Sequence, residues 1–203
     1  KKFNKLIIQT GMAYEEDIAL AMKAINSVRK KNKIILLHCT SMYPTTLENI
    51  NLNRMVSIHK RFKTEIGFSD HTLGWQAAVQ AVTLGASYVE KHITLNHDMK
   101  GPDHWFSLNI KELKEYVKKI REAEKSLGIS NIIPAKGELK YLREQRLSCV
   151  ANQNISKGAI LKEHMIEFKK PGTGIKPNKI NKFLGKKLKK NIKLNEVLKN
   201  RYF

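Results

Sequence analysis

The chain has 203 residues, of which 38 are lysine or arginine and 18 are aspartate or glutamate, so its formal net charge is +20 at pH 7. Hydrophobic residues make up 41% and charged residues 28%, which is ordinary for a globular protein that folds in water. The longest apolar runs fall well short of the ~20 residues that span a bilayer. No stretch near the first residue has the pattern of a secretory signal. We therefore expect no membrane partner.

The excess of positive charge raises the question of a nucleic-acid partner. Along Lys111–Lys125 the lysines alternate with glutamates, which is typical of a solvated helix face. The segment Lys176–Lys193 is densely basic, but its single aromatic residue, Phe183, gives no platform for stacking bases. A lysine-rich composition explains the charge at least as well and suits an anionic small substrate. We do not expect a nucleic-acid partner.

The two cysteines, Cys39 and Cys149, are too few for a disulfide framework. A reducing, cytoplasmic location fits this composition best. We expect Cys39 to be a small buried hydrophobe, because no neighbouring residue would obviously lower the pKa of its thiol.

Four apolar runs of strand length alternate with amphipathic segments of helix length over the first 127 residues. The expected strands are Lys5–Thr10, Lys33–His38, Glu65–Phe68 and Ser87–His92. The expected helices are Glu15–Lys30, Asn51–Phe62, Trp75–Leu84 and Ile110–Leu127. Strict alternation of this kind predicts parallel strands joined by helical crossovers.

The polar residues that end these four strands point to a functional edge of the sheet. They are Thr10, Ser41, His71 and His92, and parallel α/β folds collect their chemistry at the carboxyl ends of strands. The pattern fits a small doubly wound sheet or half of an eight-stranded barrel. No strand precedes a Gly-x-Gly-x-x-Gly turn, so a dinucleotide fold gains no support. The polar strand ends favour the half barrel, and two neighbouring strands ending in histidine could bring two imidazoles to one metal ion.

The character of the sequence changes after Gly128. Residues 129–145 have no clean period and contain turn formers, so we interpret them as a linker between a first domain, 1–128, and a second, 146–203. The second domain has short apolar pieces separated by turns, which predicts a small β-rich module. At roughly 60 residues it is near the lower size limit for independent stability.

Ordered motifs along the chain carry a resemblance to a known family. They are Thr10-Gly11-Met12, His38–Pro44, Gly67–Thr72, Glu90-Lys91-His92, Gly101–His104, Ser148–Ala151, Ile155–Gly158 and Lys170–Ile175. In this order they resemble the sialic acid synthase (NeuB) family, over nearly the whole chain. The resemblance implies the C-terminal half of a TIM (β/α)8 barrel followed by a β-clip SAF (antifreeze-like) domain. It also implies that the chain starts near the fifth barrel strand, as a fragment or a truncated product.

The activity implied by the resemblance is that of a transferase. Family members condense phosphoenolpyruvate with an N-acylated hexosamine of the mannosamine type, giving a nonulosonic acid such as N-acetylneuraminate and releasing phosphate. Neuraminate, legionaminate and pseudaminate synthases share these motifs, so the motifs leave the product open. The alternative from another class is a non-catalytic basic remnant that binds carbohydrate or nucleic acid.

The resemblance assigns a divalent metal, typically manganese and alternatively magnesium or cobalt, to His71 and His92. Imidazole suits borderline transition metals, and two protein ligands leave room for water and substrate. Glu90 joins the two histidines as a catalytic residue, and either Glu90 or Asp70 could orient a liganding imidazole. Each histidine taken alone could instead be a hydrogen-bonded residue that caps a strand end.

The resemblance also assigns residues to the two substrates. Hydroxyls of Thr10, Ser41 and Ser69 would face the phosphate or carboxylate of phosphoenolpyruvate, since hydroxyls are neutral donors to anions; singly, each could be a local cap or turn residue. Tyr43 and Asp103 match positions near the acceptor sugar. Asp103 could equally stabilise the turn at Gly101-Pro102.

Lys170 stands where the family usually carries an arginine that reaches a partner subunit's site. A lysine keeps the charge but lacks the planar two-pronged donor geometry, so it acts as a point charge. Lys170 could also be a solvated loop residue. The resemblance implies a homodimer in which SAF domains are exchanged, and we expect this domain to pack away from its own half barrel.

Overall fold

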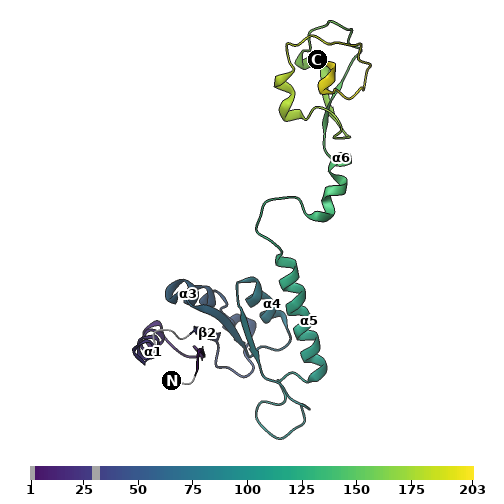
Figure 1. Cartoon of the computed structure of the whole chain (residues 1–203). Coiled ribbons are helices and arrows are strands. Elements are labelled where there is room, and N and C mark those ends of the chain that lie inside the picture. Colours follow the sequence, from purple (N-terminus) through teal and green to yellow (C-terminus); the bar gives the residue numbers. More distant parts are fainter. Residues whose placement is uncertain (1–2, 29–32) are drawn as a thin grey trace. The chain divides into compact units, whose positions relative to one another are not determined.

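The structure, a computed structural model, describes residues 3–28 and 33–203. The chain separates into two units, Lys1–Ile129 and Ser130–Phe203, each with its own internal contacts (Figure 1). In the part of the chain that the structure describes, none of the helices is long and apolar enough to cross a membrane.

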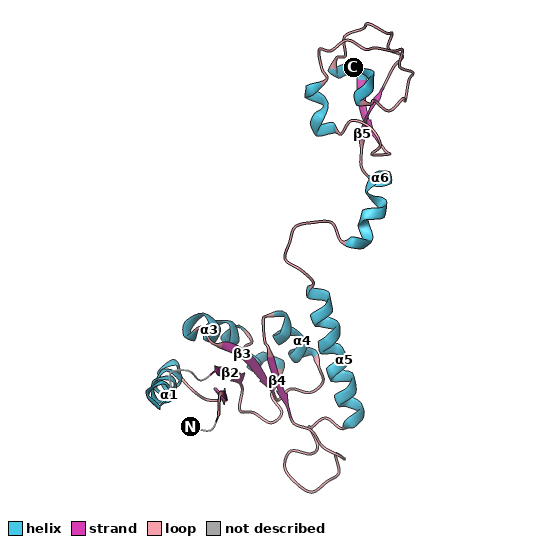
Figure 2. Cartoon of the chain, in the orientation of Figure 1, coloured by secondary structure: helices cyan, strands magenta, loops and turns pink. Residues whose placement is uncertain are grey.

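The first unit is built on a four-stranded sheet (Figure 2). Its strands are β1 (Lys5–Gln9), β2 (Lys33–Cys39), β3 (Glu65–Asp70) and β4 (Tyr88–Lys91), in the order β1-β2-β3-β4. All three pairings are parallel, with a helix in each crossover. The prediction of four consecutive parallel strand-helix units is therefore confirmed.

The sheet is curled, as a barrel requires. Strands β1 and β4 are separated by two other strands, a distance of about 14 Å in a flat sheet at ~4.8 Å per strand. Their side chains nevertheless meet: Gln9 donates a hydrogen bond to Glu90, and Lys5 donates to the Tyr88 hydroxyl at 3.1 Å. This curvature confirms the half-barrel prediction and rejects the flat doubly wound alternative.

The helices of this unit are α1 (Glu15–Val28), α2 (Leu47–Ile50), α3 (Asn53–Phe62), α4 (Gln76–Thr83) and α5 (Ile110–Leu127). The expected continuation of the first helix to Lys30 lies outside the described residues. The one-turn helix α2 was not predicted, because four residues are too few to show a period.

Helices cover the convex face of the sheet because alternate strand residues there are apolar. One core cluster contains Leu36, Ile66 and Phe68 from the sheet, Met55 from α3, and Ala77 and Ala81 from α4. A second cluster joins α4 to α5 through Val82, Tyr116 and Ile120. The alanines of α4 are small enough for the helix to lie close to the sheet, and this packing holds the carboxyl ends of β3 and β4 in place.

The second unit has far less regular structure than the β-rich module predicted from the sequence. Its two strands, β5 (Ser148–Ala151) and β6 (Ile166–Lys169), form an antiparallel pair. The helical elements are α6 (Leu142–Gln145) and the single-turn or two-turn 3-10 helices η1 (Lys136–Tyr141), η2 (Glu163–Met165), η3 (Pro177–Lys182) and η4 (Asn200–Tyr202). Both η1 and α6 fall within the segment 129–145 that the sequence suggested as a linker.

Isolated backbone bridges replace longer strands in this unit. They pair Val150 with Val197, Ile155 with Ile192 and Ile160 with Lys187. These bridges enclose an apolar core of buried side chains, among them Cys149, Leu161, Leu188, Leu198 and Tyr202. Short extended pieces with frequent turns therefore still bury a continuous core.

Candidate functional site at the carboxyl ends of the strands

The register of β3 and β4 sorts their last residues onto two faces. Ser69 lies opposite Glu90 and Asp70 lies opposite Lys91. Because successive strand residues point to opposite faces, the first pair lies on the concave side and the second on the helix-covered side. The hydroxyl of Ser69 donates to Glu90 Oε1 at 2.8 Å, which joins the concave pair.

His71 follows β3 and is buried. Its Nδ1 lies 2.8 Å from the carbonyl oxygen of Thr40. A carbonyl can only accept, so Nδ1 carries the proton and Nε2 keeps a free lone pair. Burial lowers the pKa of His71, but hydrogen bonds to Cys39 and to the Thr40 carbonyl outweigh burial and raise the pKa above its ordinary value.

His92 lies beside His71 in a cluster of rings. The centroids of the two imidazoles are 5.2 Å apart, and the ring of Tyr43 is 4.2 Å from that of His71 and 5.8 Å from that of His92. Phe106 covers His92 at 5.3 Å between centroids. Nδ1 of His92 lies 3.7 Å from Asp103 Oδ2, close enough for electrostatic attraction but too long for a hydrogen bond. The structure thus brings together His71, His92, Tyr43 and Asp103.

Glu90 faces the same side of the sheet but does not touch an imidazole. It accepts hydrogen bonds from Ser69 and from Gln9, and Ser69 Oγ in turn lies 3.5 Å from Nε2 of His71. Gln9 was not among the predicted site residues. Its position on β1 gave no signal, because β1 and β4 meet through the curl of the sheet and not through strand pairing.

The hydroxyls predicted to face phosphoenolpyruvate differ in how they are engaged. Thr10 is buried and its hydroxyl donates to the Leu37 carbonyl at 3.0 Å, so its proton is used within the sheet. Ser41 lies against Gly11, where an added Cβ would come within 2.2 Å of Ser41 Oγ. A side chain at position 11 would therefore displace the Ser41 hydroxyl from its present position.

Cys39 is buried, as predicted, but its thiol has a partner that the sequence did not reveal. Its Sγ lies 3.9 Å from Nδ1 of His71. Burial raises the pKa of the thiol, yet the neighbouring side chains of His71, Ser69 and Ser41 outweigh burial and lower the pKa below its ordinary value. The expectation that nothing nearby lowers this pKa is therefore wrong, because β2 and β3 are neighbours in space and 32 residues apart in sequence.

A buried polar network lies directly behind the two histidines. Asp70 Oδ2 accepts a hydrogen bond from the Tyr116 hydroxyl at 2.8 Å and lies 3.3 Å from Lys91 Nζ. Asp70 Oδ1 accepts from both the backbone N–H and the hydroxyl of Thr72. These bonds point Asp70 away from His71, so of the two carboxylates considered as an orienting group for an imidazole, Asp70 is excluded.

Burial and charge set the protonation of this network. Burial lowers the pKa of Lys91, and the charge and hydrogen bond of Asp70 offset part of that effect. Burial together with Asp70 raises the pKa of Tyr116, so its hydroxyl stays a donor. Tyr116 falls within the predicted helix Ile110–Leu127, and its partner could not be read from a helical period.

The donor set can be tested against the divalent metal that the resemblance implies. Two imidazoles with centroids 5.2 Å apart can reach one ion, and the Thr40 carbonyl leaves Nε2 of His71 free to bind it. Within the described residues no group of three or more His, Cys, Asp and Glu side chains is arranged to hold a metal. The residues present therefore fit an ion with two protein ligands whose remaining positions are open to water and substrate.

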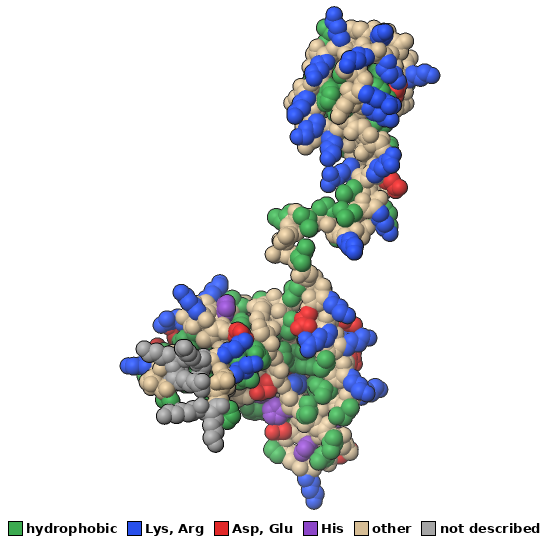
Figure 3. Space-filling model, viewed as in Figure 1, with side chains coloured by type: hydrophobic (Ala, Val, Ile, Leu, Met, Phe, Trp, Pro, Cys, Tyr) green, Lys and Arg blue, Asp and Glu red, His purple; other side chains and the backbone are tan. Residues whose placement is uncertain are grey.

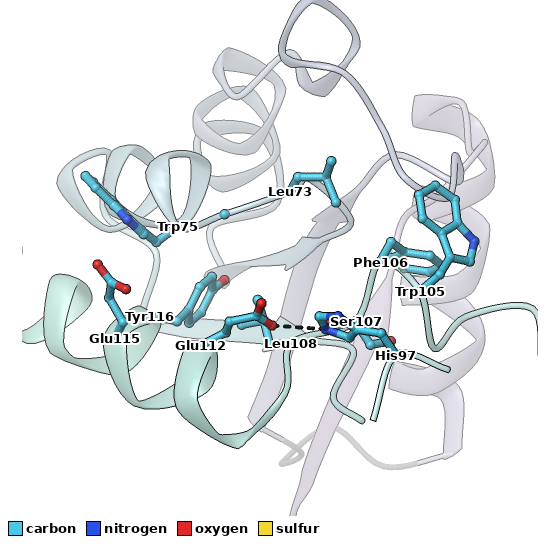
Figure 4. A pocket seen from close by; sticks show the side chains of 11 residues that line it. Leu73, Trp75, His97, Trp105, Phe106, Ser107, Leu108, Glu112, Glu115 and Tyr116 are labelled. Carbon is cyan, nitrogen blue, oxygen red and sulfur yellow. Dashed lines mark hydrogen bonds and ion pairs between the residues drawn. The ribbon is translucent and has the colours of Figure 1, made fainter. Parts of the chain in front are cut away.

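A pocket of about 320 Å³ adjoins the histidines and shares Phe106 with them (Figure 4). Trp75 and Trp105 line opposite ends of it, and Glu112, Glu115 and Tyr116 contribute from α5. Glu112 Oε2 is 3.2 Å from His97 Nε2, which closes one wall. The two tryptophans thus form walls of a cavity.

Lys170 belongs to the second unit and is exposed there. Its Nζ donates to the side-chain oxygen of Gln145 in the same unit. The loop after it is held by Ser148, whose hydroxyl donates to the Pro171 carbonyl at 2.7 Å and accepts from the Gly174 N–H at 2.9 Å. Lys170 therefore stands at the start of a loop with a fixed backbone.

Together, a curled parallel sheet whose carboxyl edge carries two imidazoles, the Glu90 carboxylate and several hydroxyls defines half of a parallel α/β barrel with its polar groups at the usual functional edge. Sequence comparison assigns the lineage. The NeuB family profile matches residues 1–131 and the SAF domain profile matches residues 148–200. The chain belongs to the NeuB family, and the prediction made from the motifs is confirmed.

Individual relatives agree with this assignment. An N,N'-diacetyllegionaminic acid synthase of Campylobacter jejuni is 40% identical over 197 residues, which cover 96% of this chain and 59% of the relative. A crystal structure of an N-acetylneuraminic acid (sialic acid) synthetase from Leptospira borgpetersenii matches with a TM-score of 0.61 and 32% identity, covering 67% of this chain and 47% of that one.

The fold is also that of a spore coat polysaccharide biosynthesis protein E from Chromobacterium violaceum, with a TM-score of 0.77 at 22% identity over 99% of this chain and 61% of that one. The chain thus spans little more than half the length of the curated relatives it matches.

Proposed function

We propose that this chain contributes the metal-binding edge and the SAF domain of a nonulosonic acid synthase. The reaction is the condensation of phosphoenolpyruvate with an N-acylated hexosamine of the mannosamine type, with release of phosphate. Membership in the NeuB family and the two named synthases among the relatives support this class. Those two relatives are named for different acids, so the proposal covers the class of product and not one member of it.

The observation that carries the proposal is the pair of imidazoles at neighbouring strand ends. His71 and His92 lie with their ring centroids 5.2 Å apart, and the Thr40 carbonyl fixes the tautomer of His71. We assign them a divalent cation, manganese first and magnesium or cobalt as alternatives. When bound, the cation supplies a Lewis acid that makes the aldehyde of the open-chain sugar electrophilic.

The bond changes of the proposed reaction set the tasks of the protein. C3 of phosphoenolpyruvate forms a bond to the aldehyde carbon, and water adds at C2. Cleavage of the bond between C2 and the bridging phosphate oxygen then leaves a keto acid and phosphate. Protons from the water pass to the new hydroxyl and to phosphate. The protein must therefore hold two substrates side by side at the strand ends and limit water to one productive position.

The concave residues divide these tasks. Glu90 is a catalytic residue in this proposal: it is oriented by Gln9 and holds Ser69 beside Nε2 of His71. Tyr43 and Asp103 flank the imidazoles and would contact the acceptor sugar.

We assign the hydroxyls of Thr10, Ser41 and Ser69 to the anionic groups of phosphoenolpyruvate. Two of them, Thr10 and Ser69, now donate within the protein. Substrate binding would therefore have to redirect these donors, whereas Ser41 needs only to leave its contact with the Cys39 thiol.

The test is calorimetric titration of the chain with manganese, alongside phosphate release by the protein as its gene encodes it. His71→Ala and His92→Ala should each remove an inner ligand, weaken manganese binding and lower turnover by roughly two or more powers of ten. His59→Ala is the matched control, because His59 is exposed on α3 and contacts the Thr64 carbonyl. Unchanged manganese affinity in both site variants would sink the proposal.

We further propose that the SAF domain, with Lys170, completes the site of a second subunit in a homodimer. The support is the fixed loop after Lys170 and the small size of the unit. Light scattering with an activity assay tests it: full activity in a strictly monomeric protein excludes the exchange.

The competing function, a basic remnant that binds carbohydrate or nucleic acid, draws on charge. Residues 130–203 contain 18 lysines and arginines but 5 aspartates and glutamates, and Figure 3 shows basic side chains distributed over this unit. Salt-sensitive oligonucleotide binding that does not depend on metal would favour the remnant. Manganese binding that requires both histidines would favour the synthase.

A further inference from the structure

The Asp70–Lys91 pair is unusual in being a charged pair enclosed by the core. Asp70 has 0% and Lys91 5% of its side chain exposed, and their charged atoms are 3.3 Å apart. The two residues are direct partners in the β3–β4 ladder, and each immediately precedes one of the histidines. Tyr116 of α5 closes the network through its hydroxyl.

Stability alone does not account for such a pair. Removing two charges from water is costly, and a protein in which well-packed apolar residues of similar volume replace a buried ion pair is often equally stable or more stable. A different benefit is visible in the other bonds that these side chains make. Both side chains bond to the backbone of Thr72, the residue that follows His71.

Asp70 and Lys91 hold the turn that follows β3. Asp70 Oδ1 accepts from the N–H of Thr72 at 2.8 Å, and Lys91 donates to the Thr72 carbonyl. His71 therefore lies between Asp70, which belongs to the ion pair, and Thr72, whose backbone both members of the pair hold. Since Lys91 belongs to β4, the same contacts tie the start of the segment carrying His92 to the turn carrying His71.

We propose that Asp70, Lys91 and Tyr116 are positioning residues that set the directions of the His71 and His92 imidazoles from behind the sheet. This inference rests on the proposed metal role of the two histidines. The network holds the two strand ends in one register, so that Nδ1 of His71 meets the Thr40 carbonyl and Nε2 is presented on the concave side.

The experiment separates positioning from stability with an apolar triple variant, Asp70→Leu/Lys91→Met/Tyr116→Phe, made in the 203-residue chain. It removes both charges and the hydroxyl together, so no unpaired charge remains buried. The matched control is Lys33→Met/Glu65→Gln, an ion pair at 2.6 Å at the opposite end of β2 and β3 with 49% and 41% of the side chains exposed. Melting temperature, manganese affinity by calorimetry, and the tautomer of His71 by nitrogen-15 NMR of the metal-free protein are measured.

The triple variant should melt near the wild-type temperature yet bind manganese about 10–100-fold more weakly, the range found when groups behind a ligand are lost. In the metal-free spectrum, His71 should lose its single Nδ1-protonated form. The control variant should change neither the manganese affinity nor the tautomer of His71. Wild-type affinity together with a wild-type His71 tautomer in a folded triple variant would overturn the proposal and leave the pair a structural element.

Two further measurements keep the outcome decisive. If the triple variant does not fold, Tyr116→Phe alone should still weaken manganese binding with little change in melting temperature, and an unchanged affinity counts against positioning. If wild type and His71→Ala bind manganese equally, the proposed function fails, and the His71 tautomer in metal-free Tyr116→Phe then decides the positioning role by itself.

Discussion

The two units of this chain treat buried polar groups in opposite ways. Among the residues that the structure describes, the fully buried polar and charged residues all belong to the first unit except Ser148. Several of them gather near the ends of β2 and β3, namely His38, Ser69, Asp70, His71 and Thr72. The second unit encloses an apolar core and leaves its many lysines exposed.

The free-energy cost of burying polar groups explains why the two units differ in this way. A buried hydroxyl, imidazole or carboxylate must find partners within the protein, which requires a rigid arrangement around it. The first unit accepts that requirement at the edge where we place the chemistry. The second unit, whose one buried polar side chain holds the Lys170 loop, is organised to present a surface.

The largest effect should come from opening the apolar core of the second unit. Leu198 is fully buried, and Leu198→Ala should lower the stability of that unit by about 2–5 kcal/mol through lost burial and the cavity left behind. Hydrogen exchange of peptides from 148–200 measures it, and Leu194→Ala, at a position 52% exposed, is the control. Because the two units have separate cores, peptides from the first unit should keep their protection; equal loss in both units would contradict the comparison.

A smaller effect is expected at the start of α5, the helix that carries Tyr116. Asn109 caps it by accepting from the N–H groups of Lys111 and Glu112, at 2.9 and 3.0 Å, and Glu112 bonds back to the Asn109 N–H. Asn109→Ala should cost about 1 kcal/mol, and Asn109→Ser should restore most of the loss. Urea unfolding followed by tryptophan fluorescence reports it, since Trp75 packs against this helix cluster. Equal stability of the alanine and serine variants would show that the cap contributes nothing.

The smallest effect should come from an exposed ion pair of the second unit. Glu196 accepts from Lys190 Nζ and from the Lys193 N–H. Partial burial raises the pKa of Glu196, but these hydrogen bonds outweigh burial and lower the pKa below 4.5. Because the folded pKa is below the unfolded one, the stabilisation is present above about pH 4.5 and is lost as the pH falls through the folded value.

Glu196→Gln should therefore melt slightly below wild type at pH 7, and the difference should shrink as the pH falls below about 4.5. Thermal melts at a series of pH values measure this. A gap that stays constant down to pH 3 would mean that the charge of Glu196 is not what stabilises the fold.

Much of the first unit was determined by the sequence itself. Alternation of apolar runs with amphipathic segments predicted parallel strands and helical crossovers, because a strand buried on both faces and a helix buried on one have different periods. The strand-end positions of His71 and His92 followed directly, since parallel strands gather their carboxyl ends at one edge. The motifs added the family, which the profile matches confirm.

The partners of the site residues were decided by the tertiary structure alone. Gln9 reaches Glu90 because the sheet curls, His71 lowers the pKa of the Cys39 thiol because β2 and β3 are neighbours, and Asp70 turns from its histidine toward Tyr116 because successive strand residues face opposite sides. These contacts join residues 81, 32 and 46 positions apart. A sequence pattern records the period of one segment, whereas curvature and packing fix which segments meet, and so only the folded chain assigns each polar group its partner.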